Sequence, residues 1–175
     1  MKKTMLVLTL AGLSVMPAAA RLWKPTPQQA AIDYTVISHN KGPDGRVIVQ
    51  WVASTAMTGP TMQQLMDKYI VISVSHSRQG PSGITTYDDV EGVQVTDGQG
   101  TALKQIPDDQ IPPSLVGMFA TSDAIMRRNT QGNGKQRWSV YESGSVHPCG
   151  PGKLQVAYDG ETYFWDTPLP GCPKN

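Results

Sequence analysis

The stretch CGPGKLQVAYDGETYFWDTPLPGC, residues 149–172, constrains the fold of this chain more than any other feature. Its centre, Asp159-Gly160, suits a type I′ turn, because that turn requires positive φ at both central residues. A turn at this dipeptide pairs Tyr158 with Glu161 and extends into two strands of about equal length. The stretch therefore predicts a β-hairpin in one defined register.

Both faces of the predicted hairpin agree on that register. One face collects the large apolar side chains, which are Leu154, Val156, Tyr158, Tyr163 and Trp165. The other face places Lys153 opposite Asp166, a favourable cross-strand pair of opposite charges. A slip of one residue would move every apolar side chain to the wrong face. We therefore expect this hairpin to pack its apolar face against a core.

The chain has only two cysteines, Cys149 and Cys172, and both lie beyond the open end of this hairpin. An even number of cysteines favours a disulfide in an oxidising compartment. The sequence has no C-x-x-C redox pair, and the spacing of the two thiols fits no common zinc site. We predict a structural bridge between Cys149 and Cys172.

Residues 1–20, MKKTMLVLTLAGLSVMPAAA, have the layout of a secretory signal peptide. A basic start is followed by a short apolar run and by three alanines that suit a cleavage site. The apolar run is shorter than the about 20 residues that a transmembrane helix needs. We expect cleavage after Ala20 and a periplasmic or secreted protein, and the Lys-Lys start suits a bacterial export signal.

The rest of the chain has the length of one ordinary domain. Residues 21–30 contain Pro25 and Pro27 and predict an extended N-terminal arm. Residues 31–175 predict a single globular β-rich domain. No stretch after residue 20 is apolar enough to span a membrane, so we expect no transmembrane anchor after processing.

The charge of the chain argues against a nucleic-acid partner. Without Lys2 and Lys3, the 15 basic residues fall to 13 against 14 acidic ones, a net charge of −1. The basic residues are scattered, whereas nucleic-acid binding needs a concentrated basic surface. We expect a protein or another cell-envelope component as the partner.

Most of the chain has the pattern of short strands separated by turn signals. Besides the hairpin, the predicted strands are 33–39, 46–55, a half-buried 69–78, 91–97, 101–106 and 136–143. A short helix is predicted from Pro60 and a longer one over 111–129, with a break near Thr121 and a new cap at Ser122. The prediction is a mainly β fold, an antiparallel β-sandwich or curled sheet built of hairpins, with one or two short helices. An α+β fold is the alternative.

The three histidines, His39, His76 and His147, fall on separate predicted elements. Imidazoles from three strands can hold zinc or copper, so a periplasmic metal-binding protein is one alternative. No two of the histidines are spaced along the chain as the ligands of a common metal site are. A cluster of methionines could also bind copper, but core packing is favoured for them; they are Met57, Met62 and Met66. We expect no bound metal and no cofactor, and we keep the histidines only as candidate ligand contacts.

A hydrolase would need a nucleophile held by a base. Ser75 adjoins His76, but neighbours along a strand point to opposite faces, and no G-x-S-x-G motif is present. A catalytic site could still assemble from dispersed residues, with His39, His76, Asp88 and Asp89 as the candidates. Asp88 and Asp89 also suit a solvated turn, since turns attract Asp for their own hydrogen bonding.

These patterns identify no reaction and no ligand. The function they favour is an exported, non-catalytic binding or interaction protein of the bacterial cell envelope. The alternatives are a small periplasmic hydrolase with a dispersed His/Asp site, and a periplasmic copper- or zinc-binding protein.

Overall fold

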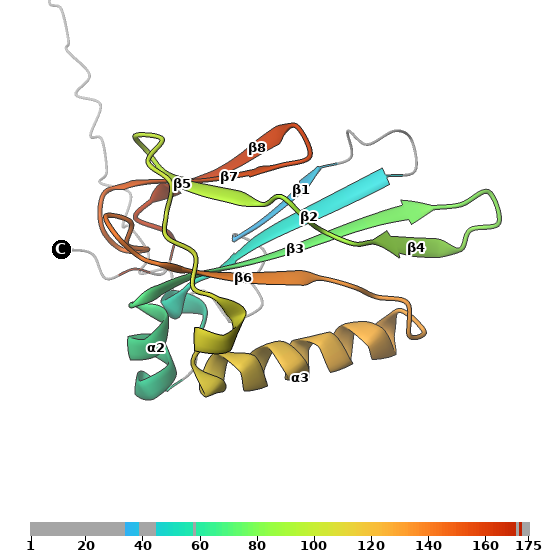
Figure 1. Ribbon diagram of the computed structural model, residues 1–175, viewed down its shortest axis with the longest axis horizontal. Coiled ribbons are helices and arrows are strands. Elements are labelled where there is room, and N and C mark those ends of the chain that lie inside the picture. Colours follow the sequence, from blue (N-terminus) through green and yellow to red (C-terminus); the bar gives the residue numbers. More distant parts are fainter. Residues whose placement is uncertain (1–33, 39–44, 58, 171, 173–175) are drawn as a thin grey trace, which may run out of the picture.

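The computed structural model describes residues 34–38, 45–57, 59–170 and 172, and Figure 1 shows them as a ribbon. They form two antiparallel sheets and two helices. The predicted signal peptide (1–20), the predicted arm (21–30) and His39 lie outside the described residues. The prediction of a mainly β, antiparallel fold is confirmed.

The larger sheet has five strands and is centred on one long strand. Its strands are β1 (Thr35–Ser38), β2 (Gly45–Val52), β3 (Tyr69–Gln79), β4 (Thr85–Asp88) and β6 (Arg137–Glu142). The order runs β1-β2-β3-β4, and β6 also pairs with β3. Strands β4 and β6 share one edge of β3, since β6 takes residues 69–74 and β4 takes residues 76–79.

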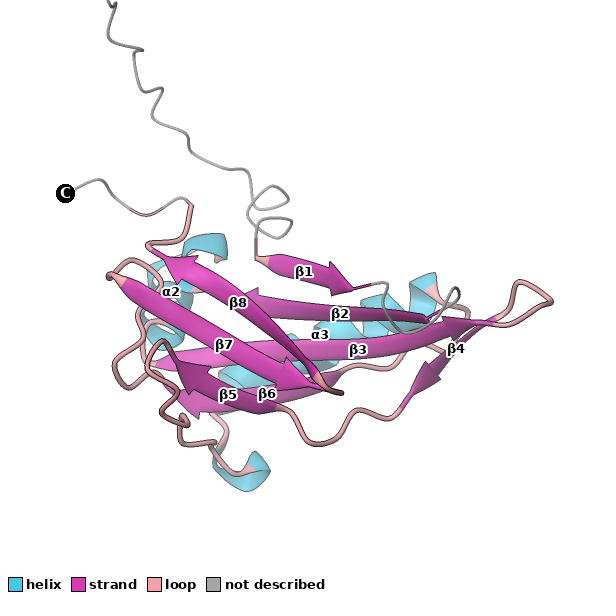
Figure 2. Cartoon of the chain, turned by 90° about the horizontal axis from the view of Figure 1, so that it is seen from above, coloured by secondary structure: helices cyan, strands magenta, loops and turns pink. Residues whose placement is uncertain are grey.

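The smaller sheet has three strands in the order β5-β7-β8. They are β5 (Gln94–Asp97), β7 (Gly152–Tyr158) and β8 (Glu161–Thr167). Figure 2 shows this sheet lying across the larger one, so that the two sheets form a sandwich. Their facing side chains make the main core, in which Trp51 and Trp165 meet edge to face with ring centroids 6.3 Å apart.

Two helices cover the other face of the larger sheet (Figure 1). They are α2 (Pro60–Met66) and α3 (Pro113–Asn129). A second core of five buried side chains joins them to the sheet, namely Met66, Val71, Leu115, Phe119 and Val140. Phe119 stacks on Trp138 with ring centroids 4.5 Å apart. In the part of the chain that the structure describes, neither helix has the length and apolar character needed to cross a membrane.

The β7–β8 hairpin has the predicted register at every position from Gly152–Thr167 to Tyr158–Glu161. Its turn residues, Asp159 and Gly160, have φ of 50° and 79°, which confirms the predicted positive φ at both. Cys149 and Cys172 form the predicted disulfide, with Cα atoms 5.3 Å apart. The bridge closes the open end of the hairpin.

Several sequence predictions were wrong where long-range packing decides. Strand β3 is buried on both faces instead of half-buried, because the helices cover the face that faces away from the sandwich. Helix α3 runs unbroken through Thr121, whose Oγ1 donates to the carbonyl of Gly117. Asp88, which was expected in a solvated turn, instead ends strand β4, and β4 pairs with β3.

The predicted strand over 101–106 is also wrong. The turn forms, but residues 101–106 make only single bridges, Thr96 with Ala102 and Gln105 with Tyr141. This segment instead lines the edges of two strands. The N–H of Leu103 donates to the carbonyl of Val95 in β5, and the N–H of Ile106 donates to the carbonyl of Val140 in β6. Residues 101–106 therefore cover one edge of each sheet.

Candidate functional site

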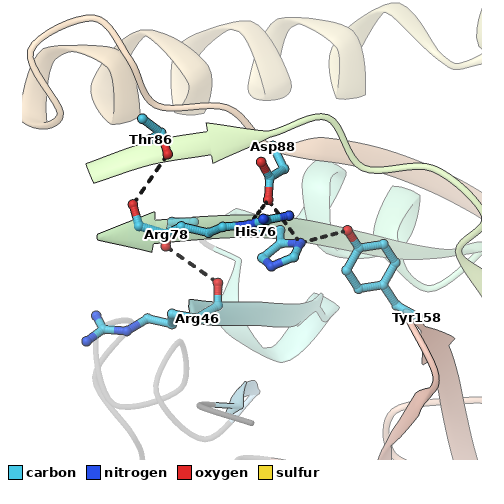
Figure 3. Close-up of polar contacts among 7 residues, drawn as sticks. Arg46, His76, Arg78, Thr86, Asp88 and Tyr158 are labelled. Atoms are coloured by element: carbon cyan, nitrogen blue, oxygen red, sulfur yellow. Dashed lines mark hydrogen bonds and ion pairs between the residues drawn. The ribbon is translucent and has the colours of Figure 1, made fainter. Parts of the chain in front are cut away.

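Of the dispersed residues considered for a site, the structure brings His76 and Asp88 together. They lie opposite each other on β3 and β4, on the face toward the small sheet. Figure 3 shows the contacts: His76 Nδ1 is 3.5 Å from Asp88 Oδ2 and 3.3 Å from the hydroxyl of Tyr158. Tyr158 reaches this point from β7 across the sandwich. The cluster therefore links both sheets.

Arg78 completes the cluster from two residues further along β3. Its Nε donates to Asp88 Oδ2 at 2.8 Å. Burial raises the pKa of Tyr158, and the nearby carboxylates of Asp159 and Asp88 raise it further. The Tyr158 hydroxyl therefore stays protonated at neutral pH. Asp88 Oδ2 therefore lies between the Arg78 guanidinium and the His76 imidazole, with the neutral Tyr158 phenol beside them.

The position of His76 makes it a poor catalytic base. The residue is 6% exposed, and its Nε2 is buried with no hydrogen-bond partner among the described residues. A general base must come within hydrogen-bond reach of the proton that it takes from a substrate. Asp88, whose side chain is 34% exposed, is the member that reaches a surface groove. The contacts of Arg78 and His76 therefore hold the Asp88 carboxylate at the edge of the groove.

The groove beside Asp88 has a volume of about 600 Å³. Polar and charged side chains dominate its lining, which consists of Asp88, Asp89, Val90, Glu91, Gly92, Val93, Gln105, Lys135, Gln136, Arg137 and Ser139. One wall is the segment 89–93, which crosses from β4 in the large sheet to β5 in the small sheet. The other wall is the start of β6 and the residues just before it.

The fold makes this groove because β4 and β6 share one edge of β3 and then separate. After Asp88 the chain leaves the large sheet, while β6 continues along β3 from Arg137. The crossover segment turns at Gly92, whose φ of +72° lies in the region that favours glycine. A gap remains between the departing segment and β6.

The two walls carry opposite charges. Three carboxylates line the groove on the side of β4 and the crossover, those of Asp88, Asp89 and Glu91, and the cations of Lys135 and Arg137 line it on the β6 side. Asp88 pairs with Arg78, and an Arg137 nitrogen lies 3.4 Å from Asp108 Oδ2, so both also have a partner of opposite charge within the protein. Lys135 Nζ lies 2.9 Å from Asp89 Oδ1, so one ion pair spans the groove. Such exposed pairs contribute only about 0.2–1 kcal/mol, so a ligand with its own charges can replace them.

His147 stands apart from the cluster, in the loop between β6 and β7. Its Nδ1 accepts the backbone N–H of Cys149 at 3.0 Å, and its Nε2 lies 3.8 Å from Asp67 Oδ1. His147 therefore helps to hold the loop that carries Cys149, and it takes no part in the cluster of His76 and Asp88. Among the described residues, no group of three or more His, Cys, Asp or Glu side chains could hold a metal ion.

Several residues of the site were missed from the sequence, above all Arg78, Lys135, Arg137 and Tyr158. One signal could have found part of it. The run Gly80-Pro81-Ser82-Gly83 is a turn, in which the N–H of Gly80 donates to the carbonyl of Ile84. Interpreting that turn as a hairpin would have paired the strands on either side and placed Asp88 opposite His76. No comparable local signal points to the β6 wall.

Comparisons with protein-family models, with curated proteins and with solved structures find no match to this chain. The function must therefore be inferred from the groove and its surroundings.

Proposed function

We propose that this protein is an exported, non-catalytic binding protein of the bacterial cell envelope, and that its groove holds a short zwitterionic segment such as a peptide. The observation that carries the proposal is the opposite charge of the two groove walls. An ammonium group of the ligand would face Asp88, Asp89 and Glu91. A carboxylate of the ligand would face Lys135 and Arg137.

Charge complementarity favours this ligand over one of a single sign. A purely anionic ligand would meet three carboxylates, and a purely cationic ligand would meet two cations, each a like-charge contact that disfavours binding. The amide of Gln105 adds a donor and an acceptor that suit peptide groups, whereas the amide nitrogen of Gln136 already donates to Asp123 at 2.7 Å. The volume of about 600 Å³ is typical of a small-molecule site.

Two features support export. Residues 1–20 have the layout of a signal peptide. The Cys149–Cys172 disulfide suits an oxidising compartment such as the periplasm or the outside of a cell. Mass spectrometry of the native protein should find a mature chain that starts at Arg21. A retained Met1 in exported protein would contradict this processing.

The experiment is a titration of the protein with tri-alanine, in which the backbone amide chemical shifts of the protein report binding. Tri-alanine with free termini should bind with a Kd on the order of 1 mM, since the contacts are few and exposed. N-acetylated and C-amidated tri-alanine each lack one charge and should bind about threefold or more weakly. Shifts should concentrate at residues 88–93 and 135–139.

Matched variants test the two walls separately. Glu91→Gln should reduce the penalty for acetylation, and Arg137→Gln should reduce the penalty for amidation, because each variant removes the charge that faces the altered terminus. Arg128→Gln, which removes an exposed cation at the end of α3, should change neither. Equal binding of capped and uncapped peptide would refute the zwitterion proposal. Cleavage of the peptide during the titration would instead favour the hydrolase alternative.

A further inference from the structure

Strand β8 pairs with β7 along one edge, and no other described segment pairs with its opposite side, which we call the open edge. In an antiparallel pair, the residues alternate between hydrogen-bonded and non-hydrogen-bonded positions. The two-residue turn makes Tyr158–Glu161 a hydrogen-bonded pair, so the backbone N–H and C=O of Thr162, Phe164 and Asp166 point away from β7. Three donors and three acceptors therefore line the open edge.

The other edges of the two sheets are covered or short. Residues 101–106 cover the edges of β5 and β6 through backbone hydrogen bonds. Strands β1 and β4 have four residues each, whereas β8 has seven. Proteins normally protect open edges by keeping them short, by covering them, or by placing charged side chains (Lys above all), Pro or bulges on them. Among the described strands, β8 is the long edge without a cover, a Lys, a Pro or a bulge, and its two charged side chains, Glu161 and Asp166, lie toward its ends.

The residues of β8 favour pairing with another strand. The strand reads ETYFWDT and contains three aromatic residues, no Lys and no Pro, and its register with β7 is free of bulges. Phe164, at its centre, is 58% exposed. The ammonium of Lys153 lies 5.2 Å from the Phe164 ring centroid and 3.2 Å from Asp166, so the outer face around this ring carries a balanced charge. Unpaired backbone groups along a strand edge can bind an added strand, and Phe164 lies at the centre of this edge.

We propose that β8 pairs antiparallel with β8 of a second copy of this chain, about a two-fold axis at Phe164. The strand is complementary to itself in this arrangement. Phe164 meets Phe164 of the second copy, and on either side Tyr163 lies opposite Trp165 and Thr162 opposite Asp166. Glu161 falls opposite Thr167, so each carboxylate faces a hydroxyl and never another carboxylate. Such isologous pairing is the usual form of a symmetric dimer.

The register is defined by the same residues. Centring the pair on Phe164 uses all seven residues of each strand, and it turns two three-stranded sheets into one of six strands. A shift of one residue would place the outward-pointing backbone groups of one strand opposite residues whose N–H and C=O groups point toward β7, so the hydrogen bonds between the two copies would not form. A shift of two residues would place Asp166 opposite the Phe164 ring. The dimer is independent of the groove, so it can be tested whether or not peptide binds there.

The first test is the mass in solution, measured by sedimentation equilibrium of the mature chain from about 1 to 500 μM. The wild type should form a dimer as its concentration rises. Phe164→Lys places a charge on the open edge and should shift the protein to monomer. Gln155→Lys places the same charge on the same face, but on the inner strand β7, and should leave the dimer intact. Circular dichroism should show that both variants are folded.

The second test fixes the register. Paired residues in this position have Cα atoms about 5.5 Å apart, within reach of a disulfide. Phe164→Cys should therefore form a cross-linked dimer under mild oxidation. Thr162→Cys lies opposite Asp166 of the second copy, about 14–15 Å from its own equivalent between Cα atoms, and should not cross-link. Hydrogen exchange of the wild type should show concentration-dependent protection of the amides of Thr162, Phe164 and Asp166.

A wild type that is monomeric across the whole range would overturn the proposal and leave the edge to a strand from a different protein. The proposal would also be wrong if Phe164→Lys remained a dimer, or if Thr162→Cys cross-linked as well as Phe164→Cys. The last result would indicate an association without the two-fold at Phe164.

Discussion

The β7–β8 hairpin and the groove wall made by β4 and the crossover segment 89–93 are built in contrasting ways. The hairpin joins residues that are close in sequence, through a two-residue turn, a closing disulfide and large side chains in the main core. The groove wall has a short strand and charged side chains, and exposed ion pairs from Arg78 and Lys135 hold it. The hairpin contributes large buried side chains to the main core, and the wall carries charged side chains at the surface.

This contrast predicts that substitutions in the hairpin cost far more stability than substitutions in the wall. The reason is that burial of a large apolar side chain contributes several kcal/mol, whereas an exposed ion pair contributes at most about 1 kcal/mol. The tests below run from the largest expected effect to the smallest.

Truncation of Trp165 should have the largest effect. Trp165→Ala removes a buried indole that packs edge to face on Trp51, and it should lower the free energy of unfolding by about 3–5 kcal/mol. Denaturant unfolding with fluorescence or circular dichroism measures this. Phe164→Ala, one residue away on the exposed face, is the control and should change stability by less than about 0.5 kcal/mol at monomer concentrations. Similar losses for the two variants would contradict the assignment of faces.

Removal of the disulfide should come next. The Cys149→Ser/Cys172→Ser variant should lose about 2–4 kcal/mol, because the unfolded chain gains the freedom that the bridge had removed. Peptide binding at the groove should persist at low temperature, since the bridge closes the hairpin end and contributes no side chain to the groove. A variant that kept full stability but lost binding would show that the cysteines belong to a working site.

A substitution in the groove wall should cost much less. Arg78→Gln breaks the 2.8 Å contact with Asp88, but the Arg78 side chain is 64% exposed, so the loss should be about 0.5 kcal/mol. Added salt should reduce the difference in unfolding free energy between the wild type and the variant, because salt screens exposed charges. A loss of 3 kcal/mol or more would mean that the His76 network supports the whole sandwich, and the contrast between the two regions would fail.

The turn at Asp97 predicts an acid dependence outside both regions. The N–H of Thr101 donates to Asp97 Oδ1 and, with further donors from Gln99 and Ser145, holds the pKa of Asp97 below its usual 3.8. A carboxylate with a lowered folded pKa stabilises the protein above its unfolded pKa, and that stabilisation is lost as the pH falls through the folded value. Asp97→Asn should therefore reduce the fall in Tm between pH 5 and pH 2. If the Tm of Asp97→Asn fell with pH as the Tm of the wild type does, Asp97 would not contribute to the loss of stability in acid.

The arrangement of the site residues could not be predicted from the sequence. His76 and Asp88 were both considered, but as dispersed residues, and Asp88 was assigned to a solvated turn. Their meeting depends on the pairing of β4 with β3, and the approach of Tyr158 depends on how the two sheets cross. Arg137 and Lys135 line the groove only because β6 pairs with the same edge of β3 as β4 does. No pattern within any one of these segments specifies that arrangement.

The sequence by itself determined the register of the β7–β8 hairpin, its core face and its disulfide. Turn geometry and alternation act over a few residues, so Asp159-Gly160 and the apolar positions around it leave one solution. Only the tertiary structure decided that β4 and β6 share an edge of β3, that residues 101–106 cover two edges, and that no described segment pairs with the outer edge of β8. Those outcomes depend on contacts between segments far apart in the chain, where many pairings have similar loop-closure entropy and packing of the whole molecule selects among them.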